Sequence, residues 1–434
     1  MQKPVNVIYV NSHDTGRFIQ PMGYYIDTPV LQGLAEEGTL FRNCHAAAPT
    51  CSPSRAALVT GMYPHSVGQI GLSHRGFVIT HPEYHIARHL ASHGYHTAAW
   101  GMPDNHTGGG DQVGYQQQLG KEHAAVIDFI DGTHEQPVFL SISHNLTHRV
   151  GPGFTTDPDH QRYDPRYLAV PPCLPDTPET RADWAHFCSD ASALDRHIGE
   201  VLDALDRNGL TDNTLIIATT DHGVPFPFYK CSLTQQGTGV FLIMRGPGGF
   251  SGGQVVDQMV SHLDLFPTIC AVAGIDIPSR LHGTDLIPSL DPDNAPIHDE
   301  LFAEVTYHAA YEAKRAVRTA THLYERRFHD RLQPVLPNCD KSPTKSLLMD
   351  AGWPAQIEVR EALYDTRLDP QERTNLIDSP AHAELADSMR QRLAAWMERT
   401  DDPLLAGQVP LPEGAFTNDP GGIHPSLQAG ATPS

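Results

Sequence analysis

The 434-residue chain has no apolar run long enough to cross a membrane, and it has few positive charges. Its 30 lysines and arginines stand against 51 aspartates and glutamates, which gives a formal net charge of −21. Nucleic acids and anionic membrane surfaces would repel such a chain, so neither is expected as a partner. A small anionic substrate would have to be held by positive charge that is gathered locally.

The chain also has only seven cysteines, an odd number without paired spacing. This usage is typical of a reduced compartment and predicts no disulfide framework. The first residues lead directly into an apolar strand pattern at Asn6 to Val10, which leaves no room for a signal peptide. We therefore expect a cytoplasmic protein. Assembly into a homo-oligomer is left open by the sequence.

Short apolar runs alternate along the chain with helical patterns, which is typical of an α/β fold. Buried strands are expected at 6–10, 95–100, 137–143, 214–220 and 239–244, and helices at 28–38, 124–130 and 180–208. From about residue 301 the pattern changes to an antiparallel meander, with strands at 315–324 and 361–365, and a last helix follows at about 381–400. Several of the early strands end in polar residues, where open α/β sheets place their sites.

The segment from Cys51 to Gly61 reads as a nucleophile at the start of a helix. Ser52 suits the N-cap position and Pro53 the first helical position, while Gly61 can end the helix. Cys51 would then lie just outside a helix N-terminus, where backbone N–H groups and the helix dipole favour an anion. Arg55, one turn further, adds donors that match a tetrahedral oxyanion. The alternative is a buried structural cysteine beside an ordinary helix start.

This run resembles the sulfatase signature, Cys-x-Pro-Ser-Arg followed by Leu-x-Thr-Gly, with every fixed position filled. The resemblance extends over residues 5–400, and segments 175–183, 221–227 and 396–403 are most similar to the heparan N-sulfatase (sulfamidase-like) group. It implies an alkaline-phosphatase-like mixed central sheet sandwiched by helices in a catalytic domain at 1–300. A smaller C-terminal α+β domain with an antiparallel sheet is expected at 301–400, and an irregular tail rich in proline and glycine at 401–434.

The resemblance implies that Cys51 is converted to formylglycine by a formylglycine-generating enzyme, and that a divalent metal binds beside it. The expected metal site consists of His13, Asp14, Cys51, Asp221 and His222, although His13 stands where sulfatases usually have a second acidic residue. Carboxylates and the family norm favour Ca²⁺. Binding through two imidazoles would favour Mn²⁺ or Zn²⁺ instead.

Further site residues follow from the same resemblance. Arg55 and Lys230 are expected to contact the sulfate, and His144, at the end of strand 137–143, to protonate the leaving group. His106 is carried over from a Gly-Lys-x-His segment whose lysine is absent here. Three further residues are expected to bind the rest of an anionic substrate, unless they are ordinary solvated loop residues: His74, His148 and Arg149.

The function predicted from these residues is hydrolysis of a sulfate ester or a sulfamate by a sulfatase, with a sulfated amino sugar as one candidate substrate. A phosphonate monoester or phosphodiester hydrolase on the same scaffold is the alternative, because of His222 and the missing lysine. A catalytically silent sugar-anion binder is a third hypothesis, which predicts an unmodified Cys51.

Overall fold

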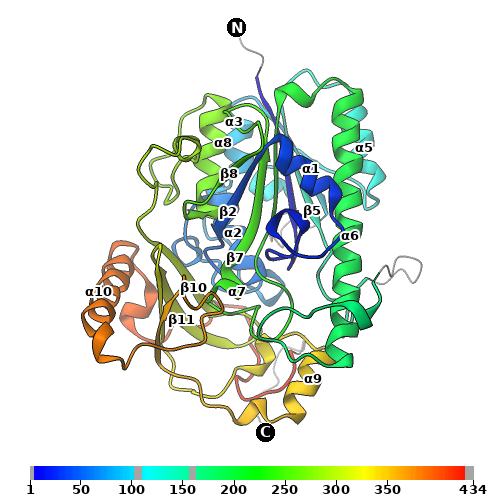
Figure 1. Cartoon of the computed structure of the whole chain (residues 1–434). Coiled ribbons are helices and arrows are strands. Elements are labelled where there is room, and N and C mark those ends of the chain that lie inside the picture. The colour runs from blue at the N-terminus through cyan, green and yellow to red at the C-terminus, as the bar shows by residue number, and fades with distance from the viewer. Residues whose placement is uncertain (1–3, 102–109, 156–162, 426–434) are drawn as a thin grey trace.

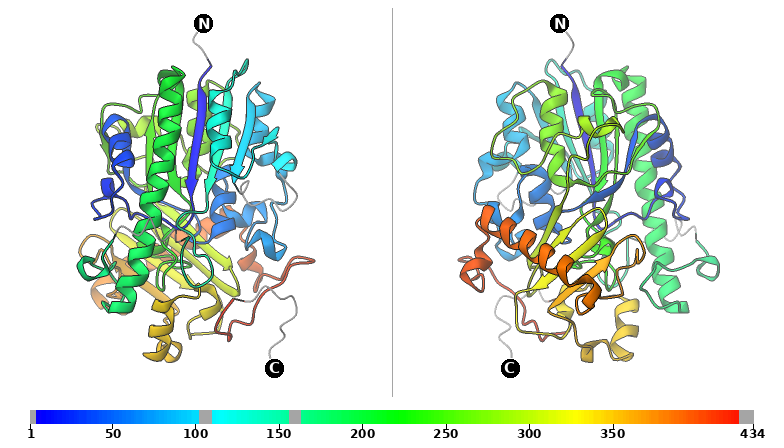
Figure 2. Two further views of the ribbon diagram at one scale, coloured as in Figure 1. Left: turned by 90° about the vertical axis from the view of Figure 1, so that its right-hand side faces the viewer. Right: turned by 60° about the vertical axis from the view of Figure 1, so that its left-hand side comes forward.

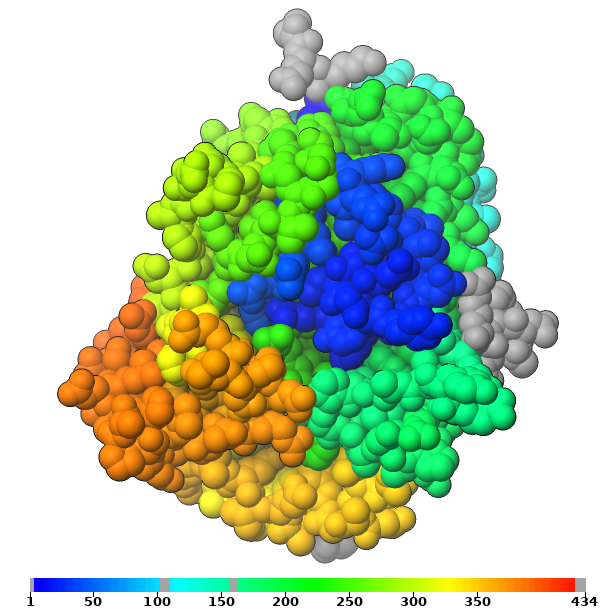
Figure 3. Space-filling view, viewed as in Figure 1, coloured from blue at the N-terminus to red at the C-terminus, as the bar shows by residue number. Residues whose placement is uncertain are grey.

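The computed structural model describes residues 4–101, 110–155 and 163–425, and two separate sheets organise them (Figure 1). The larger sheet has nine strands and the smaller has four. Both parts contribute to one continuous surface, as the space-filling view shows (Figure 3). In the described part of the chain, no helix is both long enough and apolar enough for a membrane span.

The large sheet is mixed. Its strands run in the order β4-β3-β5-β1-β6-β7-β2-β8, with β9 paired to β2. β7 is antiparallel to both of its neighbours, and the other pairs are parallel. The strands are β1 (Asn6–Ser12), β2 (Thr39–His45), β3 (His96–Gly101), β4 (Gln117–Gln118), β5 (Val138–His144), β6 (Thr214–Thr220), β7 (Gly239–Arg245), β8 (Gln254–Val256) and β9 (Val260–Ser261).

Helices cover both faces of this sheet (Figures 1 and 2). Side chains alternate between the two faces along each strand, so Val7 and Tyr9 of β1 join one core while Ile8 and Val10 join the other. The first core includes α2 (Cys51–Thr60), α3 (Ile86–Ser92) and α8 (Leu265–Ala273), and the second includes α1 (Pro29–Glu37), α5 (Ala124–Asp131) and α6 (Pro178–Arg207). Near-continuous apolar strands with helices on both faces confirm the predicted fold class.

The small sheet is antiparallel throughout, in the order β10-β11-β12-β13. Its strands are β10 (Leu301–Tyr307), β11 (Tyr311–Arg318), β12 (His322–Arg327) and β13 (Glu361–Asp365). The helix α10 (Ala383–Arg399) covers it, and Trp396 stacks on Phe302 with ring centroids 4.9 Å apart. The other α-helices in the described residues are α4 (Gly110–Val113), α7 (Gln235–Thr238) and α9 (Pro343–Asp350).

The described part of the tail packs back onto its own chain. The Tyr307 hydroxyl donates a 2.7 Å hydrogen bond to the carbonyl of Val409, and the Asn418 N–H donates one of 2.8 Å to the carbonyl of Ala309. These bonds hold residues beyond 401 against the small sheet, so the irregular segment has a defined place in the fold.

Several boundaries differ from the sequence prediction, among them those of α2, of β5 and between β11 and β12. The helix α2 begins at Cys51 with Thr50 as its N-cap, and the Ser52 hydroxyl instead accepts a 3.0 Å hydrogen bond from the Ser73 N–H. The strand expected at 137–143 continues to His144. The strand expected at 315–324 is the end of β11 and the start of β12, because the chain turns between Thr319 and His322.

Candidate active site

The register of three parallel strands brings the polar segments together. Ser12, the last residue of β1, lies opposite Thr220 of β6 and opposite His144 of β5. The residues that follow these strands therefore leave the sheet at the same level of the same edge. That edge is the carboxyl end of the central strands, where α/β folds place ligands.

A compact buried cluster lies at this edge and consists of Asp14, Cys51, Asp221 and His222. One side-chain ligand atom from each residue lies within 4.8 Å of the others. His222 Nε2 is 3.1 Å from Asp14 Oδ1 and 3.4 Å from Cys51 Sγ. The Asp14 N–H donates a 2.8 Å hydrogen bond to Asp221 Oδ1, which ties the ends of β1 and β6 together.

Local backbone geometry explains how these side chains reach one another. Asp14 has a φ of 58°, a left-handed conformation that aspartate tolerates better than most residues. A Cβ at Gly223 would lie 2.0 Å from the carbonyl oxygen of Gln236, so only glycine fits directly after His222. The Ser54 hydroxyl donates a 2.5 Å hydrogen bond to the Asp221 carbonyl, which fixes the first turn of α2 beside β6.

Cationic side chains surround the cluster. Lys230 Nζ lies 3.1 Å from Asp14 Oδ2, and His148 Nε2 lies 3.9 Å from the same oxygen. Arg55 Nε lies 4.0 Å from Asp221 Oδ2. The acidic chain thus gathers local positive charge at this site, as binding of a small anion requires.

These charges determine the protonation of the Cys51 thiol. Burial alone would raise its pKa, but the charges of Lys230 and His222, with hydrogen bonds from His148 and His222, lower the pKa of Cys51 well below its usual value. The site therefore stabilises an anion at the position of the Cys51 side chain.

The same charges and burial also shift the pKa values of the groups around Cys51. Burial opposes protonation of His222, yet the carboxylates of Asp221 and Asp14 raise its pKa to about 9. His148 behaves alike: burial opposes protonation, but Asp14 and a hydrogen bond to Cys51 raise its pKa to about 9. Burial raises the pKa of Asp221 to about 6, although the charge of His222 acts in the opposite direction.

The cluster fits a divalent cation. Among the described residues, nothing donates a hydrogen bond to the buried Oδ2 of Asp221, so this oxygen is an unsatisfied acceptor beside the cluster. Two carboxylates are hard oxygen ligands of the kind that Ca²⁺ prefers, and an imidazole and the Cys51 side chain complete the set. Four of the five residues expected to bind metal from the sequence are thus together.

The fifth, His13, is not a member of this cluster. Its Nε2 lies 3.2 Å from the Ser143 hydroxyl, and its ring contacts the Arg55 guanidinium. Burial, and then the charge of Arg55, lowers the pKa of His13 well below its usual value, so the ring is neutral. His13 is therefore placed to orient Arg55.

The structure does not bring His144 to Cys51. As the last residue of β5, His144 follows Ser143 and so points to the opposite face of the sheet, where the rings of His123 and His197 lie. Burial, and then those two rings, lowers the pKa of His144 well below its usual value. Its expected place beside the cluster is taken by His148, which the loop after β5 carries.

The remaining expected residues have different surroundings. His74 is exposed and lies in the short 3-10 helix η3 (Ser73–Arg75), close enough to Cys51 to interact with its charge. Arg149 is buried in a paired hydrogen bond with Asp183, at 2.8 and 2.9 Å, so its guanidinium is used within the protein. His106 lies outside the described residues.

One site residue has no signal in the sequence. Asp340 Oδ2 lies 3.0 Å from Lys230 Nζ, which is also 3.1 Å from Asp14 Oδ2. Burial opposes its ionisation, but Lys230 and then His148 lower the pKa of Asp340 to about 2. Asp340 lies in an aperiodic segment between β12 and α9, and only the tertiary fold brings it to Lys230.

Comparison with known proteins gives two family matches. The model described as sulfatase matches residues 5–275, and the model described as N-sulphoglucosamine sulphohydrolase, C-terminal, matches residues 224–330. The chain is 29% identical over 447 residues to N-sulphoglucosamine sulphohydrolase of Homo sapiens, covering 87% of this chain and 86% of the human protein.

Solved structures share the fold at lower sequence identity. One is a protein in complex with its substrate, D-glucosamine-2-N,6-O-disulfate, with a TM-score of 0.72, 17% identity, and coverage of 92% of this chain and 99% of that one. Another is the phosphonate monoester hydrolase of Agrobacterium radiobacter, with a TM-score of 0.68, 17% identity, and coverage of 95% and 99%.

Proposed function

Because the chain belongs to the sulfatase family, whose members are sulfuric ester hydrolases, we propose that it hydrolyses a sulfate ester or a sulfamate at the Cys51 cluster. The proposal includes conversion of Cys51 to formylglycine by a formylglycine-generating enzyme, and a bound divalent metal, Ca²⁺. The single observation that carries it is the convergence of Cys51 with two buried carboxylates and surrounding cations at one helix N-terminus.

The reaction needs an attacking oxygen and neutralisation of the charge on the sulfuryl group. A hydrated formylglycine at position 51 would supply the attacking oxygen, and its second hydroxyl would let the sulfate leave by re-formation of the aldehyde. A bound Ca²⁺ supplies Lewis-acid polarisation and orients the reactants. The chain itself contributes positive charge. Arg55 lies beside the carboxylate of Asp221 and Lys230 beside that of Asp14, and both stabilise the developing oxyanions.

His148 is the residue best placed to protonate the leaving group. Its Nε2 faces the cluster, and its raised pKa keeps the ring protonated at neutral pH. The ring is partly open to solvent, with 38% of the side chain exposed, so a substrate can reach it. A general acid must lie within hydrogen-bond reach of the departing atom, and His144 on the other face of the sheet does not meet that condition.

A sulfated amino sugar is the substrate class that the relatives favour. The name of the human relative specifies N-sulphoglucosamine, and the fold relative was solved with a glucosamine disulfate. Hydrolysis of a sulfamate leaves an amine, which must be protonated as it departs, and His148 supplies this proton.

The decisive experiment combines a mass measurement with a substrate comparison. Protein made in its own host, or together with a formylglycine-generating enzyme, should yield a Cys51 peptide that carries an aldehyde or its hydrate. The same preparation should hydrolyse N-sulfoglucosamine or an O-sulfated glucosamine faster than an aryl phosphonate.

Two outcomes would contradict the proposal. An unmodified thiol under those conditions, with binding but no turnover, would favour a silent sugar-anion binder. A large preference for the aryl phosphonate would favour a phosphonate monoester or phosphodiester hydrolase, the alternative suggested by His222 within the cluster.

A further inference from the structure

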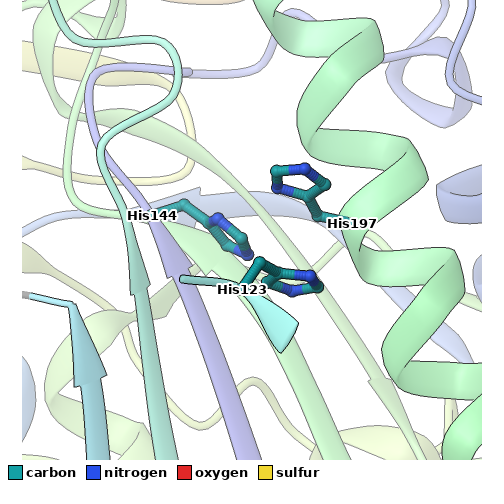
Figure 4. A group of neighbouring side chains, drawn as sticks. All are labelled: His123, His144 and His197. Carbon is teal, nitrogen blue, oxygen red and sulfur yellow. The ribbon is translucent and has the colours of Figure 1, made fainter. Parts of the chain in front are cut away.

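Three histidines from different elements meet on the face of the large sheet opposite Cys51. His123 is the N-cap residue of α5, His144 ends β5, and His197 lies on α6. One ring nitrogen from each lies within 4.8 Å of the others. The close-up shows the three rings gathered between the end of β5 and α6 (Figure 4). Neither the sulfuryl chemistry nor the Cys51 cluster uses this group.

Two ring nitrogens of the group are buried without a hydrogen-bond partner in the described part of the chain: Nε2 of His123 and Nε2 of His144. His123 Nδ1 lies 2.8 Å from the Glu200 carboxylate, to which it donates its proton, so that Nε2 carries the lone pair. A carboxylate that fixes an imidazole in this way is the usual outer partner of a metal-binding histidine.

We propose that His123, His144 and His197 form a Zn²⁺ site, separate from the carboxylate-rich cluster at Cys51. Imidazole is a preferred ligand of Zn²⁺, and three histidines with an open fourth position are a recurrent zinc arrangement. The Cys51 cluster has two carboxylates and favours a hard cation, so the two sites select different ions.

The rings need a limited adjustment to bind the ion. Tetrahedral Zn–N bonds of about 2.0–2.1 Å bring ligand nitrogens to about 3.3 Å from one another. The rings of His123 and His197 are now stacked, with an angle of 12° between their planes, so one of them must turn. Both side chains are only partly buried, and staggered side-chain rotations can provide this movement without a change in the helices.

Trp100 closes one side of the group. Its ring lies 5.0 Å from that of His144 and 5.4 Å from that of His123, centroid to centroid. The burial of His144, together with the neighbouring rings, lowers the pKa of that residue, so its imidazole is neutral and able to donate a lone pair. A metal bound here would tie the end of β5 to α5 and α6, four residues before His148.

The test is zinc stoichiometry in the whole protein with Ca²⁺ present. Wild-type protein is dialysed against Ca²⁺ and micromolar free Zn²⁺, and the bound metals are measured by elemental analysis. One Zn²⁺ per chain is expected, with an X-ray absorption spectrum showing three imidazole ligands. His197→Gln and His123→Gln should each lose this Zn²⁺, and zinc should raise the melting temperature of the wild type but not of these two variants.

Two further variants make the result specific. His186→Gln removes another partly buried histidine of α6 and should retain Zn²⁺. Asp221→Asn alters the Cys51 cluster and should also retain it. Absence of Zn²⁺ from the wild type, its retention in both His197→Gln and His123→Gln, or its loss in Asp221→Asn would overturn the proposal. His123 and His197 lie on different helical segments and are both only partly buried, so failure of one variant to fold leaves the other to decide.

Discussion

The ammonium of Lys230 lies 3.0 Å from Oδ2 of Asp340, a residue that the chain supplies only after three strands of the small sheet. Lys230 is buried, and its pKa is raised well above the usual value by Asp14 and Asp340 despite the opposing effect of burial. Asp340 therefore acts as a positioning residue. It holds the charged end of Lys230 beside Asp14 of the cluster.

Replacement of Asp340 by asparagine should lower kcat/KM by about tenfold to a hundredfold, roughly 1.4–2.7 kcal/mol of transition-state stabilisation. The amide keeps the shape but not the charge that fixes Lys230. Steady-state kinetics should be accompanied by a melting curve, to separate loss of activity from loss of folding. Asp330→Asn, which removes an exposed carboxylate paired with Arg360, is the matched control and should behave as wild type. A wild-type kcat/KM in Asp340→Asn would refute the positioning role.

His148→Gln tests the assignment of the general acid. Its kcat on N-sulfoglucosamine should fall by about 10²–10⁴-fold, the usual contribution of general acid catalysis. The loss should be much smaller with nitrophenyl sulfate, because a nitrophenolate leaves without a proton. A fall in activity above the pKa of about 9 should be present in the wild type and absent in the variant.

His144→Gln provides the comparison. Its ring lies on the other face of the sheet, so any loss should be the same for both leaving groups. If instead the leaving-group dependence is found in His144→Gln and not in His148→Gln, the assignment from the sequence is the correct one.

Arg149→Gln should act on stability. The buried carboxylate of Asp183 would lose its paired donor, and breaking a buried ion pair typically costs about 3–5 kcal/mol in the free energy of unfolding. Urea unfolding measures this directly. Arg166→Gln, in an exposed pair with Asp164, should leave the urea midpoint unchanged. An increase in KM without any loss of stability would show that Arg149 binds substrate after all.

Calcium binding should depend on pH. Metal ligands must be deprotonated, and burial raises the pKa of Asp221 to about 6. Protons on His222, whose pKa is about 9, and below about pH 6 also protons on Asp221, compete with the cation, so the apparent affinity for Ca²⁺ should fall as the pH falls, by up to about tenfold per pH unit for each titrating ligand. Isothermal titration calorimetry between about pH 5 and 8 checks the slope and the release of protons on binding.

The control for this experiment is Asp221→Asn, which should bind Ca²⁺ weakly at every pH. A pH-independent affinity in the wild type would contradict the expectation. If elemental analysis finds stoichiometric manganese and no calcium, the metal of the Cys51 cluster is Mn²⁺ and the assignment of Ca²⁺ is wrong.

The sequence was sufficient for five strands of the large sheet and for most of the cluster, because both depend on local signals, but it did not predict β2, β4, β8 or β9. The apolar run at 214–220 is β6 to the residue, and Asp221 and His222 follow it directly. Asp14 follows β1 in the same way, and parallel pairing of the two strands forces the two segments together. Cys51 was identified from the residues around it, although the N-cap is Thr50.

The sequence was insufficient where one residue decides the direction of a side chain. β5 ends one residue later than predicted, so that His144 is its last residue and points to the face opposite Cys51, while His148 in the following loop lies near Cys51. Strand ends cannot be predicted to a single residue. The Lys230–Asp340 and Arg149–Asp183 pairs join distant segments. No local pattern marks such partners, since the fold alone determines their distance.

The burial of Cys51 determines whether modification of this residue comes before or after folding of the chain. Only 6% of the residue is exposed in the folded chain, and it is enclosed by Asp14, His222 and the first turn of α2. An enzyme that oxidises this cysteine must bind the residues around Cys51, and these residues are accessible only before they fold into α2 and pack against the sheet. On the proposed mechanism, conversion of Cys51 would therefore have to precede folding, and a chain that folds with an intact thiol would stay inactive until it unfolds again.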